Sequence, residues 1–391
     1  MVMNVNHVVV VGAGLAGLRS AEALRARGFG GRITLIGQER HRPYDRPPLS
    51  KAVLSGAADS SFLDADFDAL EIAFWPGVTA KALREGVVET TEGELGYDGL
   101  VIATGAEPIT VPGDGPQHVL RTLDDAHELR ARLVRGARVA VIGAGWIGAE
   151  VATAARKAGC AVTVIEAGPT PLANAVGPEI GARTQRWYDG VDLRLNTMVD
   201  SVDEGGVELV GGEFVEAHVV VTGIGVRPAV EWLAGSDIDL HNGVVTDEHL
   251  RTSLPNVVAA GDCAAWWSRR YQARLRVEHW DTALGSPEVA AATLMGEDAV
   301  YDPAPYFWSE QFGHMVQYIG HHPSGDRLLY RGGPEGKWSA VWLTPGDTLA
   351  AVLAVDRPRD YVQGRRIIEG GHRLDTERLV DPEVPLRDCV V

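Results

Sequence analysis

Two stretches of the chain show the same order of apolar and polar positions. In each, a short apolar run predicts a strand, a segment of good helix formers predicts a helix, and a second apolar run predicts another strand. The predicted elements are Val8–Val11, Leu18–Arg27 and Ile33–Ile36, and then Arg138–Ile142, a helix that ends at Lys157, and Ala161–Ile165. β-branched runs of this kind are typical of buried parallel strands, so we expect an α/β fold.

A glycine-rich turn joins the strand to the helix in both stretches. It reads Gly12-Ala13-Gly14-Leu15-Ala16-Gly17 in the first and Gly143-Ala144-Gly145-Trp146-Ile147-Gly148 in the second. In this GxGxxG pattern the first glycine permits the tight turn, the second admits a pyrophosphate, and the third packs helix on strand. The phosphates are expected at the helix N-terminus, where amides are unpaired. Two copies in full context predict two dinucleotide sites, as required when a flavin dinucleotide takes hydride from a nicotinamide dinucleotide.

An acidic residue marks the end of the second stretch. Glu166 lies eighteen residues after Gly148, where a carboxylate accepts hydrogen bonds from the ribose hydroxyls of NAD. The same carboxylate repels a 2′-phosphate, so we expect NADH to be preferred over NADPH. The matching position in the first stretch is Gly37, and the nearest acid there is Glu39.

Composition excludes several classes of partner. Glycine is in excess, at 46 of 391 residues, and the formal net charge of −17 disfavours nucleic acid. The cysteines, Cys160, Cys263 and Cys389, form no CxxC pair and no disulfide framework, which favours a cytoplasmic protein. No apolar run reaches the ~18–20 residues of a membrane span. The N-terminus lacks the basic segment of a signal peptide, and the histidines lack metal-ligand spacing, so no metal is expected.

Further motifs follow one another in a fixed order. They are RPYDRPPLSK at 42–51, LVIATGA at 100–106, GAGWIGAE at 143–150, GIGVRP at 223–228, AAGDCA at 259–264, EHW at 278–280 and FWSEQ at 307–311. In this order they resemble the NADH-dependent, FAD-containing ferredoxin reductases of oxygenase systems, the putidaredoxin reductase and aromatic-ring dioxygenase reductase family with its glutathione-reductase-like fold. The resemblance runs from Val8 to about Gly320.

The resemblance implies a domain organisation. It has two Rossmann-like dinucleotide-binding domains and a small α+β C-terminal interface domain. The expected FAD-binding domain is discontinuous, at 1–110 and 237–305; the NAD-binding domain spans 111–236 and the C-terminal domain 306–391. In the last of these the pattern predicts strands at Tyr318–Gly320, Arg327–Arg331 and Ala340–Leu343 and a helix at Asp360–Glu369.

The resemblance also implies a reaction. Such an enzyme takes a hydride from NADH onto FAD and passes single electrons to a 2Fe–2S ferredoxin that feeds an oxygenase. The segment Gly37–Leu54 contains no cysteine, which argues against a disulfide-type flavoenzyme, and Cys263 is expected to be a packing residue. The alternative is an NADH oxidase, or a quinone or rubredoxin reductase with another acceptor. A non-catalytic FAD-binding signalling protein is disfavoured by the intact motifs.

Lys51 and Glu150 are the expected catalytic residues. Lysine occurs four times beside 32 arginines, so a lysine here indicates a need for a compact charge. The resemblance places Lys51 beside the flavin, where its ammonium stabilises the negative charge of the reduced form. It pairs Lys51 with Glu150, which also contacts the nicotinamide amide. The alternative is a surface lysine and an exposed helix glutamate.

The other cofactor positions follow from the motifs and the resemblance. For FAD they are Gly12, Gly14, Ala16, Gly17, Glu39, Arg46, Lys51, Val78, Ala103, Thr104, Gly105, Arg121, Gly261, Asp262, Glu278, His279, Trp280 and Trp308. For NADH they are Gly143, Gly145, Trp146, Ile147, Gly148, Glu150, Glu166 and Gly225. A surface position for Arg121 and plain packing for Trp146 remain open alternatives.

Two positions depart from the family pattern. Asn174 lies in the loop where the family often carries an arginine for the NADH phosphates. Ser286-Pro287-Glu288 replaces a glycine-containing stretch after the EHW motif. Because proline suits a helix start, this segment predicts a shifted helix N-terminus.

Four arginines precede the EHW motif: Arg269, Arg270, Arg274 and Arg276. A positive patch there suits an acidic, transiently bound ferredoxin, because complementary charge speeds the encounter. A solvated loop is the alternative. The chain is expected to be a monomer or a weak homodimer.

Overall fold

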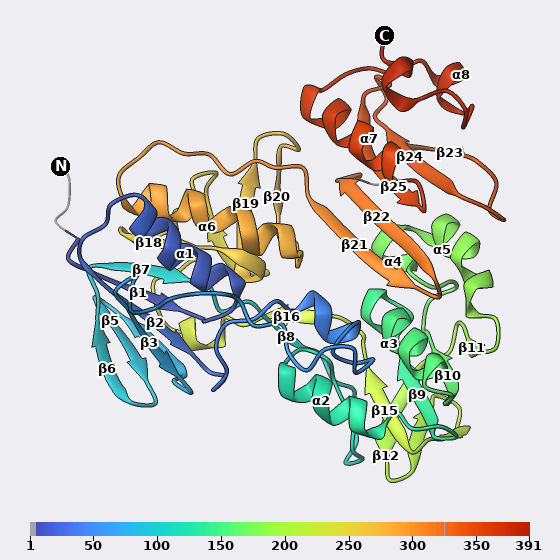
Figure 1. Ribbon diagram of the computed structural model, residues 1–391, viewed down its shortest axis with the longest axis horizontal. Coiled ribbons are helices and arrows are strands. Elements are labelled where there is room, and N and C mark those ends of the chain that lie inside the picture. The colour runs from blue at the N-terminus through green and yellow to red at the C-terminus, as the bar shows by residue number, and fades with distance from the viewer. Residues whose placement is uncertain (1–4, 324) are drawn as a thin grey trace. The chain divides into compact units, whose positions relative to one another are not determined.

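The computed structural model describes residues 5–323 and 325–391, so the start of the N-terminal segment, where no signal peptide is expected, lies outside the described residues. The chain divides into two compact units, each built from three segments (Figure 1). Unit 1 consists of Met1–Asp45, Ser61–Glu107 and Arg227–Pro305. Unit 2 consists of Arg46–Ser60, Pro108–Val226 and Tyr306–Val391. The predicted three-domain borders stay a prediction.

The centre of unit 1 is a five-stranded parallel sheet in the order β18-β7-β1-β2-β3. The strands are β1 (His7–Val11), β2 (Arg32–Gly37), β3 (Ile72–Pro76), β7 (Gly99–Ile102) and β18 (Val257–Ala259). Val8 and Val10 of β1 belong to one apolar core and Val9 and Val11 to another. Alternate residues of β1 therefore fill a core on each face of the sheet, as expected for a strand whose last four residues are all valine.

Two helices of unit 1 pack against each other: α1 (Leu15–Ala26) and α6 (Trp280–Leu294). The remaining elements form two small sheets and two 3₁₀ turns. They are β4 (Ala80–Arg84), β5 (Val87–Thr90) and β6 (Gly93–Gly96); β17 (Val244–Thr246), β19 (Ala264–Ser268) and β20 (Ala273–Leu275); and η3 (Glu231–Leu233) and η4 (Gly261–Cys263).

The expected helix start at Ser286-Pro287-Glu288 is wrong. α6 begins at Trp280, so Pro287 lies in the helix interior. There the proline removes one backbone donor from the helix. Ser286, the residue before it, donates its hydroxyl proton to the Thr282 carbonyl at 2.6 Å and accepts the Gly261 amide at 2.9 Å.

Unit 2 contains a second parallel sheet, in the order β11-β10-β9-β15. Its strands are β9 (Arg138–Ile142), β10 (Ala161–Ile165), β11 (Asp192–Arg194) and β15 (Val219–Thr222). An antiparallel sheet of β12 (Val199–Asp203), β13 (Gly206–Leu209) and β14 (Phe214–Glu216) accompanies it. The helices are α2 (Leu123–Arg132), α3 (Trp146–Lys157), α4 (Ala173–Val176), α5 (Pro178–Thr184), η1 (Pro47–Ser50) and η2 (Gln185–Tyr188). The short strands β8 (Ala106–Pro108) and β16 (Val226–Pro228) each contain one of the unit boundaries.

The C-terminal part of unit 2 is a five-stranded antiparallel sheet in the order β21-β22-β25-β24-β23. Its elements are β21 (Tyr306–Gln311), β22 (His314–Gly320), β23 (Arg327–Arg331), β24 (Trp338–Leu343), β25 (Leu349–Val355), α7 (Pro358–Gly370), α8 (Thr376–Leu379) and η5 (Leu386–Cys389). The strands and the helix expected there are present. α7 approaches β25 closely, because a Cβ on Gly364 would lie 2.7 Å from the Val352 side chain.

A buried arginine ties the last segment of the chain to this sheet. Arg331 of β23 is fully buried, and its Nε donates to Asp360 at 3.3 Å. Its terminal nitrogens donate to the Leu379 and Val384 carbonyls. Asp360 also accepts from Arg357 at 2.8 Å, so the buried carboxylate is paired twice.

We expect Arg331→Met to lower the free energy of unfolding by about 3 kcal/mol, because breaking a buried pair leaves polar groups uncompensated. Arg327→Met, on the same strand, is the control, since Arg327 pairs with Asp347 at the surface and such pairs contribute about 0–1 kcal/mol. Denaturant unfolding of both variants measures the difference. Equal losses would contradict the assignment.

Candidate functional site

The first glycine-rich turn is fixed by contacts within unit 1. Gly12 has a φ of +107°, and a Cβ there would lie 2.2 Å from the Ala103 carbonyl oxygen. A Cβ on Gly17 would lie 1.7 Å from the Gly12 carbonyl oxygen, so both positions require glycine. Gly14, the N-cap of α1, has open space within 4 Å of its Cβ position. The amides at the start of α1 therefore face space that suits a phosphate.

The second glycine-rich turn repeats this arrangement in unit 2. A Cβ on Gly143 would lie 2.5 Å from the Gly223 carbonyl oxygen, and one on Gly148 would lie 2.0 Å from that of Gly143. The middle glycine, Gly145, is the N-cap of α3, and its nearest neighbour would be 3.9 Å away. Both turns thus fit a dinucleotide pyrophosphate, with tight packing at the outer glycines and room at the middle one.

The acid that follows the second copy contacts its own turn. Glu166 Oε2 accepts the Ala144 amide at 2.7 Å, and Oε1 accepts the Gly168 amide at 2.7 Å. The turn is tied to the end of the second strand in the same way in both copies. The Gly12 amide donates to the Ile36 carbonyl, and the Gly143 amide donates to the Ile165 carbonyl.

The matching position in the first copy, Gly37, has no room for an acid. A Cβ there would lie 2.5 Å from the Ala13 Cβ, so glycine is required. The nearest acid, Glu39, accepts the Tyr44 hydroxyl at 2.5 Å. Val78 is buried, and its amide donates to the Gly37 carbonyl at 2.9 Å.

Two further motifs surround the first turn. Ala103, Thr104 and Gly105 follow β7, and the Thr104 hydroxyl donates to the Ala229 carbonyl at 2.7 Å. Gly261 has a φ of +73°, and a Cβ on it would lie 2.9 Å from the Ala16 Cβ. The structure therefore brings these segments together in unit 1.

The Glu278-His279-Trp280 segment leads into α6. The Trp280 indole Nε1 donates to Asp45 Oδ1 at 2.8 Å, which fixes the ring. Burial lowers the pKa of His279 to about 4, and the charge of Asp262 acts in the opposite direction, so His279 is neutral at neutral pH. Burial raises the pKa of the Cys263 thiol, which suits a packing residue.

Lys51 and Glu150 form an ion pair within unit 2. The distance from Lys51 Nζ to Glu150 Oε2 is 2.8 Å, and the Glu150 side chain is only 4% exposed. The alternative of a surface lysine with an exposed helix glutamate does not describe this pair. Ser50 and Ser309, which the sequence did not single out, donate to the two oxygens of the same carboxylate.

The other expected residues of unit 2 lie in several environments. Arg46 donates to the Arg121 carbonyl, and the Arg121 amide donates to Asp125 at 3.0 Å. Trp308 stacks on Tyr306 with ring centroids 5.9 Å apart. Gly225 has a φ of +118°, a conformation that favours glycine.

Apolar side chains lie beside the second glycine-rich turn. The Trp146 ring contacts Phe307 at 4.5 Å between centroids, which agrees with the packing alternative. Ile147 and Ile224 are each 42% exposed. Ile224 was not among the residues expected beside this turn, although it follows Gly223 in the GIGVRP motif and lies next to Gly143.

Comparison with known proteins agrees with this arrangement. The sequence model of the pyridine nucleotide-disulphide oxidoreductase family matches residues 6–286, and that of the reductase C-terminal family matches 306–390. The chain belongs to the pyridine nucleotide-disulphide oxidoreductase family. It is 39% identical to the anthranilate 1,2-dioxygenase system ferredoxin–NAD(+) reductase component of Burkholderia cepacia, over 98% of this chain and 99% of the relative.

Solved structures are similar over the full length. The structure of Fdr9 has a TM-score of 0.95 at 50% identity, covering 97% of this chain and 99% of that one. The covalent putidaredoxin reductase–putidaredoxin complex has a TM-score of 0.94 at 34% identity, with 98% of each chain covered. These findings confirm the recognised family, the α/β fold, the oxidoreductase class and the cofactors FAD and NAD(H). The roles of individual residues stay predictions.

The four arginines of the expected patch differ in their surroundings. Arg269 pairs with Glu248 at 2.7 Å, and Arg276 pairs with Glu278 at 2.6 Å. Arg274 donates to the Thr246 and Ala265 carbonyls, which carry no net charge. Arg269 and Arg276 are thus each paired with a glutamate.

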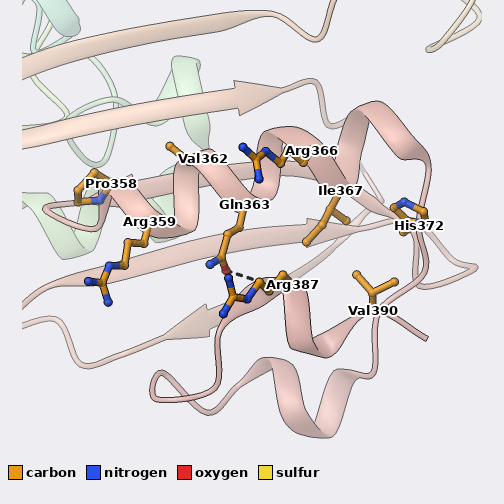
Figure 2. Close-up of a pocket in the computed structure, with 9 residues that line it drawn as sticks. All are labelled: Pro358, Arg359, Val362, Gln363, Arg366, Ile367, His372, Arg387 and Val390. Carbon is orange, nitrogen blue, oxygen red and sulfur yellow. Dashed lines mark hydrogen bonds between the residues drawn. The ribbon is translucent and has the colours of Figure 1, made fainter.

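Asn174, the family departure, is exposed on the short helix α4. A groove of about 560 Å³ lies elsewhere, between α7 and the segment of Arg387 and Val390 (Figure 2). None of the expected site residues lines it. Within residues 5–323 and 325–391, no group of three or more His, Cys, Asp or Glu is placed to hold a metal ion. In the same part of the chain, no helix is both long and apolar enough to cross a bilayer.

Gly145→Ala tests whether the second turn holds a pyrophosphate. The added methyl group has room, so we expect the free energy of unfolding to change by less than about 1 kcal/mol. It occupies the approach to the α3 amides, so we expect affinity for NADH to fall roughly tenfold, the cost of a modest steric clash. NADH titration and denaturant unfolding measure the two effects. The control, Gly148→Ala, meets the Gly143 carbonyl and should instead lose stability; an unchanged NADH affinity in Gly145→Ala would refute the fit.

Proposed function

We propose that this chain is an NADH:ferredoxin reductase of an oxygenase system. The observation that carries the proposal is the pair of glycine-rich turns, one in each unit, both closed at the outer glycines and open at the middle one. FAD, when bound, supplies the redox chemistry by taking hydride from NADH and releasing single electrons to an acceptor. The chain binds and orients the two dinucleotides.

The first turn and the loops around it are the proposed FAD pyrophosphate site. Amides at the start of α1 hold the phosphates, and Asp262 accepts a hydrogen bond from a hydroxyl of the cofactor chain. Trp280, whose indole is held by Asp45, presents a fixed aromatic face. His279 stays neutral beside it, so no competing positive charge arises there at neutral pH.

The second turn and Glu166 are the proposed NADH site. The Glu166 carboxylate is held by the Ala144 and Gly168 amides, so its position relative to the turn is fixed. Each carboxylate oxygen can accept a further bond, which leaves capacity for ribose hydroxyls. A 2′-phosphate meets a fixed negative charge there, which supports the preference for NADH.

Lys51 is the proposed catalytic cation. Its ammonium is a compact donor that stabilises negative charge as hydride arrives. Glu150 orients Lys51, since the carboxylate is buried and its Oε2 lies 2.8 Å from the lysine Nζ.

The absence of a redox cysteine supports an external acceptor. The segment 37–54 contains no cysteine, and Cys263 is fully buried. Electrons therefore leave for a partner, and the relative from Burkholderia cepacia, named a ferredoxin–NAD(+) reductase component, supports a ferredoxin. We propose a transiently bound acidic 2Fe–2S ferredoxin, a cytoplasmic location and a monomer or weak homodimer.

The purified protein is expected to carry FAD, to be bleached by NADH faster than by NADPH, and to reduce a 2Fe–2S ferredoxin in steady turnover. Anaerobic absorbance spectra and a ferredoxin-coupled assay measure this. A protein that binds no flavin would overturn the function. A preference for NADPH would overturn only the argument from Glu166, and turnover with quinone but not with ferredoxin would favour the alternative acceptor.

Reversing charge at Arg270 and Arg274 tests the docking patch. We expect Arg270→Glu with Arg274→Glu to slow ferredoxin reduction about tenfold at low salt. The patch would no longer attract an acidic ferredoxin, and electrostatic attraction of this kind raises association rates by about tenfold or more. NADH reduction of an artificial acceptor should not change. Arg84→Glu with Arg251→Glu, which changes the net charge equally outside the patch, is the control. If both double variants behave alike, the patch does not dock the ferredoxin.

A further inference from the structure

One buried carboxylate in unit 2 joins three segments of the chain. Glu150, on α3, accepts Lys51 Nζ and the Ser50 hydroxyl at Oε2. At Oε1 it accepts the Ser309 hydroxyl at 2.6 Å and the Glu310 amide at 3.2 Å. Donors from the 46–60 segment thus hold one oxygen, and donors from β21 hold the other.

The contacts of Lys51 are unequal. Its ammonium lies 2.8 Å from Glu150, whereas its contacts to the Pro47 carbonyl and the Ser50 hydroxyl are both 3.4 Å. The place of the ammonium within unit 2 therefore depends mainly on where Glu150 Oε2 lies. Because a carboxylate is planar, anchoring Oε1 also sets the position of Oε2.

Ser309 is suited to anchor Oε1. It is almost completely buried, and its oxygen accepts the Gln311 side-chain amide at 3.1 Å. A hydroxyl has a single proton, and Glu150 is its charged acceptor. The hydrogen bonds therefore run from Gln311 through Ser309 to Glu150.

We propose that Ser309 is a positioning residue for hydride transfer, acting through Glu150 on Lys51. This role rests on the proposed function, since it requires Lys51 to act on the cofactor. It gives the C-terminal part of the chain, through β21, a direct effect on the proposed catalytic cation. Ser309 itself takes no part in the chemistry.

The chain offers a matched control one turn further along α3. The Thr153 hydroxyl accepts the Phe312 amide at 2.9 Å and donates to the Ala149 carbonyl at 2.7 Å. It links the same helix to the end of the same β21–β22 hairpin, and it too is buried. The Thr153 hydroxyl bonds to Ala149 and Phe312 and not to the Glu150 carboxylate, so its loss tests the structural effect of such a link.

The experiment compares Ser309→Ala, Ser309→Thr and Thr153→Val as FAD-containing holoproteins. Anaerobic stopped-flow gives the limiting rate of flavin reduction and the half-saturating NADH concentration. We expect Ser309→Ala to lower the limiting rate about tenfold, the equivalent of one hydrogen bond to a charged group. Ser309→Thr should restore the rate. Thr153→Val should lower the melting temperature without changing the rate.

A double-variant cycle tests the path through Lys51. Lys51→Met alone should slow reduction, and adding Ser309→Ala to it should have no further effect, because the group being positioned is gone. If Ser309→Ala fails to retain FAD, Ser309→Cys replaces it, since a thiol fills similar space but is a weak donor.

The outcomes separate the two proposals. An unchanged limiting rate in Ser309→Ala, or an equal loss in the Lys51→Met background, overturns the positioning role while leaving the reductase function intact. A wild-type protein whose flavin NADH does not reduce overturns the proposed function, and this role with it.

Discussion

The close approach of helix to strand at the two glycine-rich turns is the constraint on which the other features depend. The outer glycines of each turn have carbonyl oxygens within 2.5 Å of where a Cβ would stand, so no other residue fits. This packing directs the first amides of α1 and α3 towards open space, which suits a phosphate. It also determines which strand end can carry an acidic residue. There is room for Glu166 directly after β10, whereas a side chain at position 37, at the end of β2, would collide with Ala13. The asymmetry between the two copies, one with an acid at the strand end and one without, is therefore a packing result.

Within unit 2 the buried Glu150 carboxylate has a comparable organising effect. A buried charge is costly unless its oxygens are hydrogen-bonded, and here four donors from two distant segments satisfy it. Removing any one donor therefore leaves the carboxylate less firmly positioned relative to the other three donors. The ion pair is consequently evidence about geometry more than about stability, because buried pairs of this kind often add little net free energy. What it provides is a fixed ammonium on an otherwise arginine-rich chain.

Elements with local signals were predicted from the sequence, and contacts between distant residues were not. Arg138–Ile142 and Ala161–Ile165 coincide with β9 and β10, because an apolar run bounded by glycines specifies a buried strand. The Lys51–Glu150 pair came from resemblance, but Ser309 was missed as its partner, since 159 residues separate it from Glu150 and no periodicity connects them. Pro287 was misplaced because proline's missing donor usually excludes it from helix interiors. In α6 the Ser286 hydroxyl, one residue before Pro287, accepts the Gly261 amide, a contact with a distant residue that the local pattern does not reveal.

Consecutive residues of the RPYDRPPLSK motif make contacts in different units. Its first part is held in unit 1, where the Tyr44 hydroxyl donates to Glu39 and Asp45 accepts the Trp280 indole. From Arg46 onwards the motif belongs to unit 2, and Ser50 and Lys51 both donate to Glu150. The prolines between these anchors restrict the backbone, so the chain reaches Glu150 with few alternative conformations. A substitution in this short segment therefore acts on hydrogen bonds in one unit or in the other, depending on which side of the Asp45–Arg46 boundary it lies.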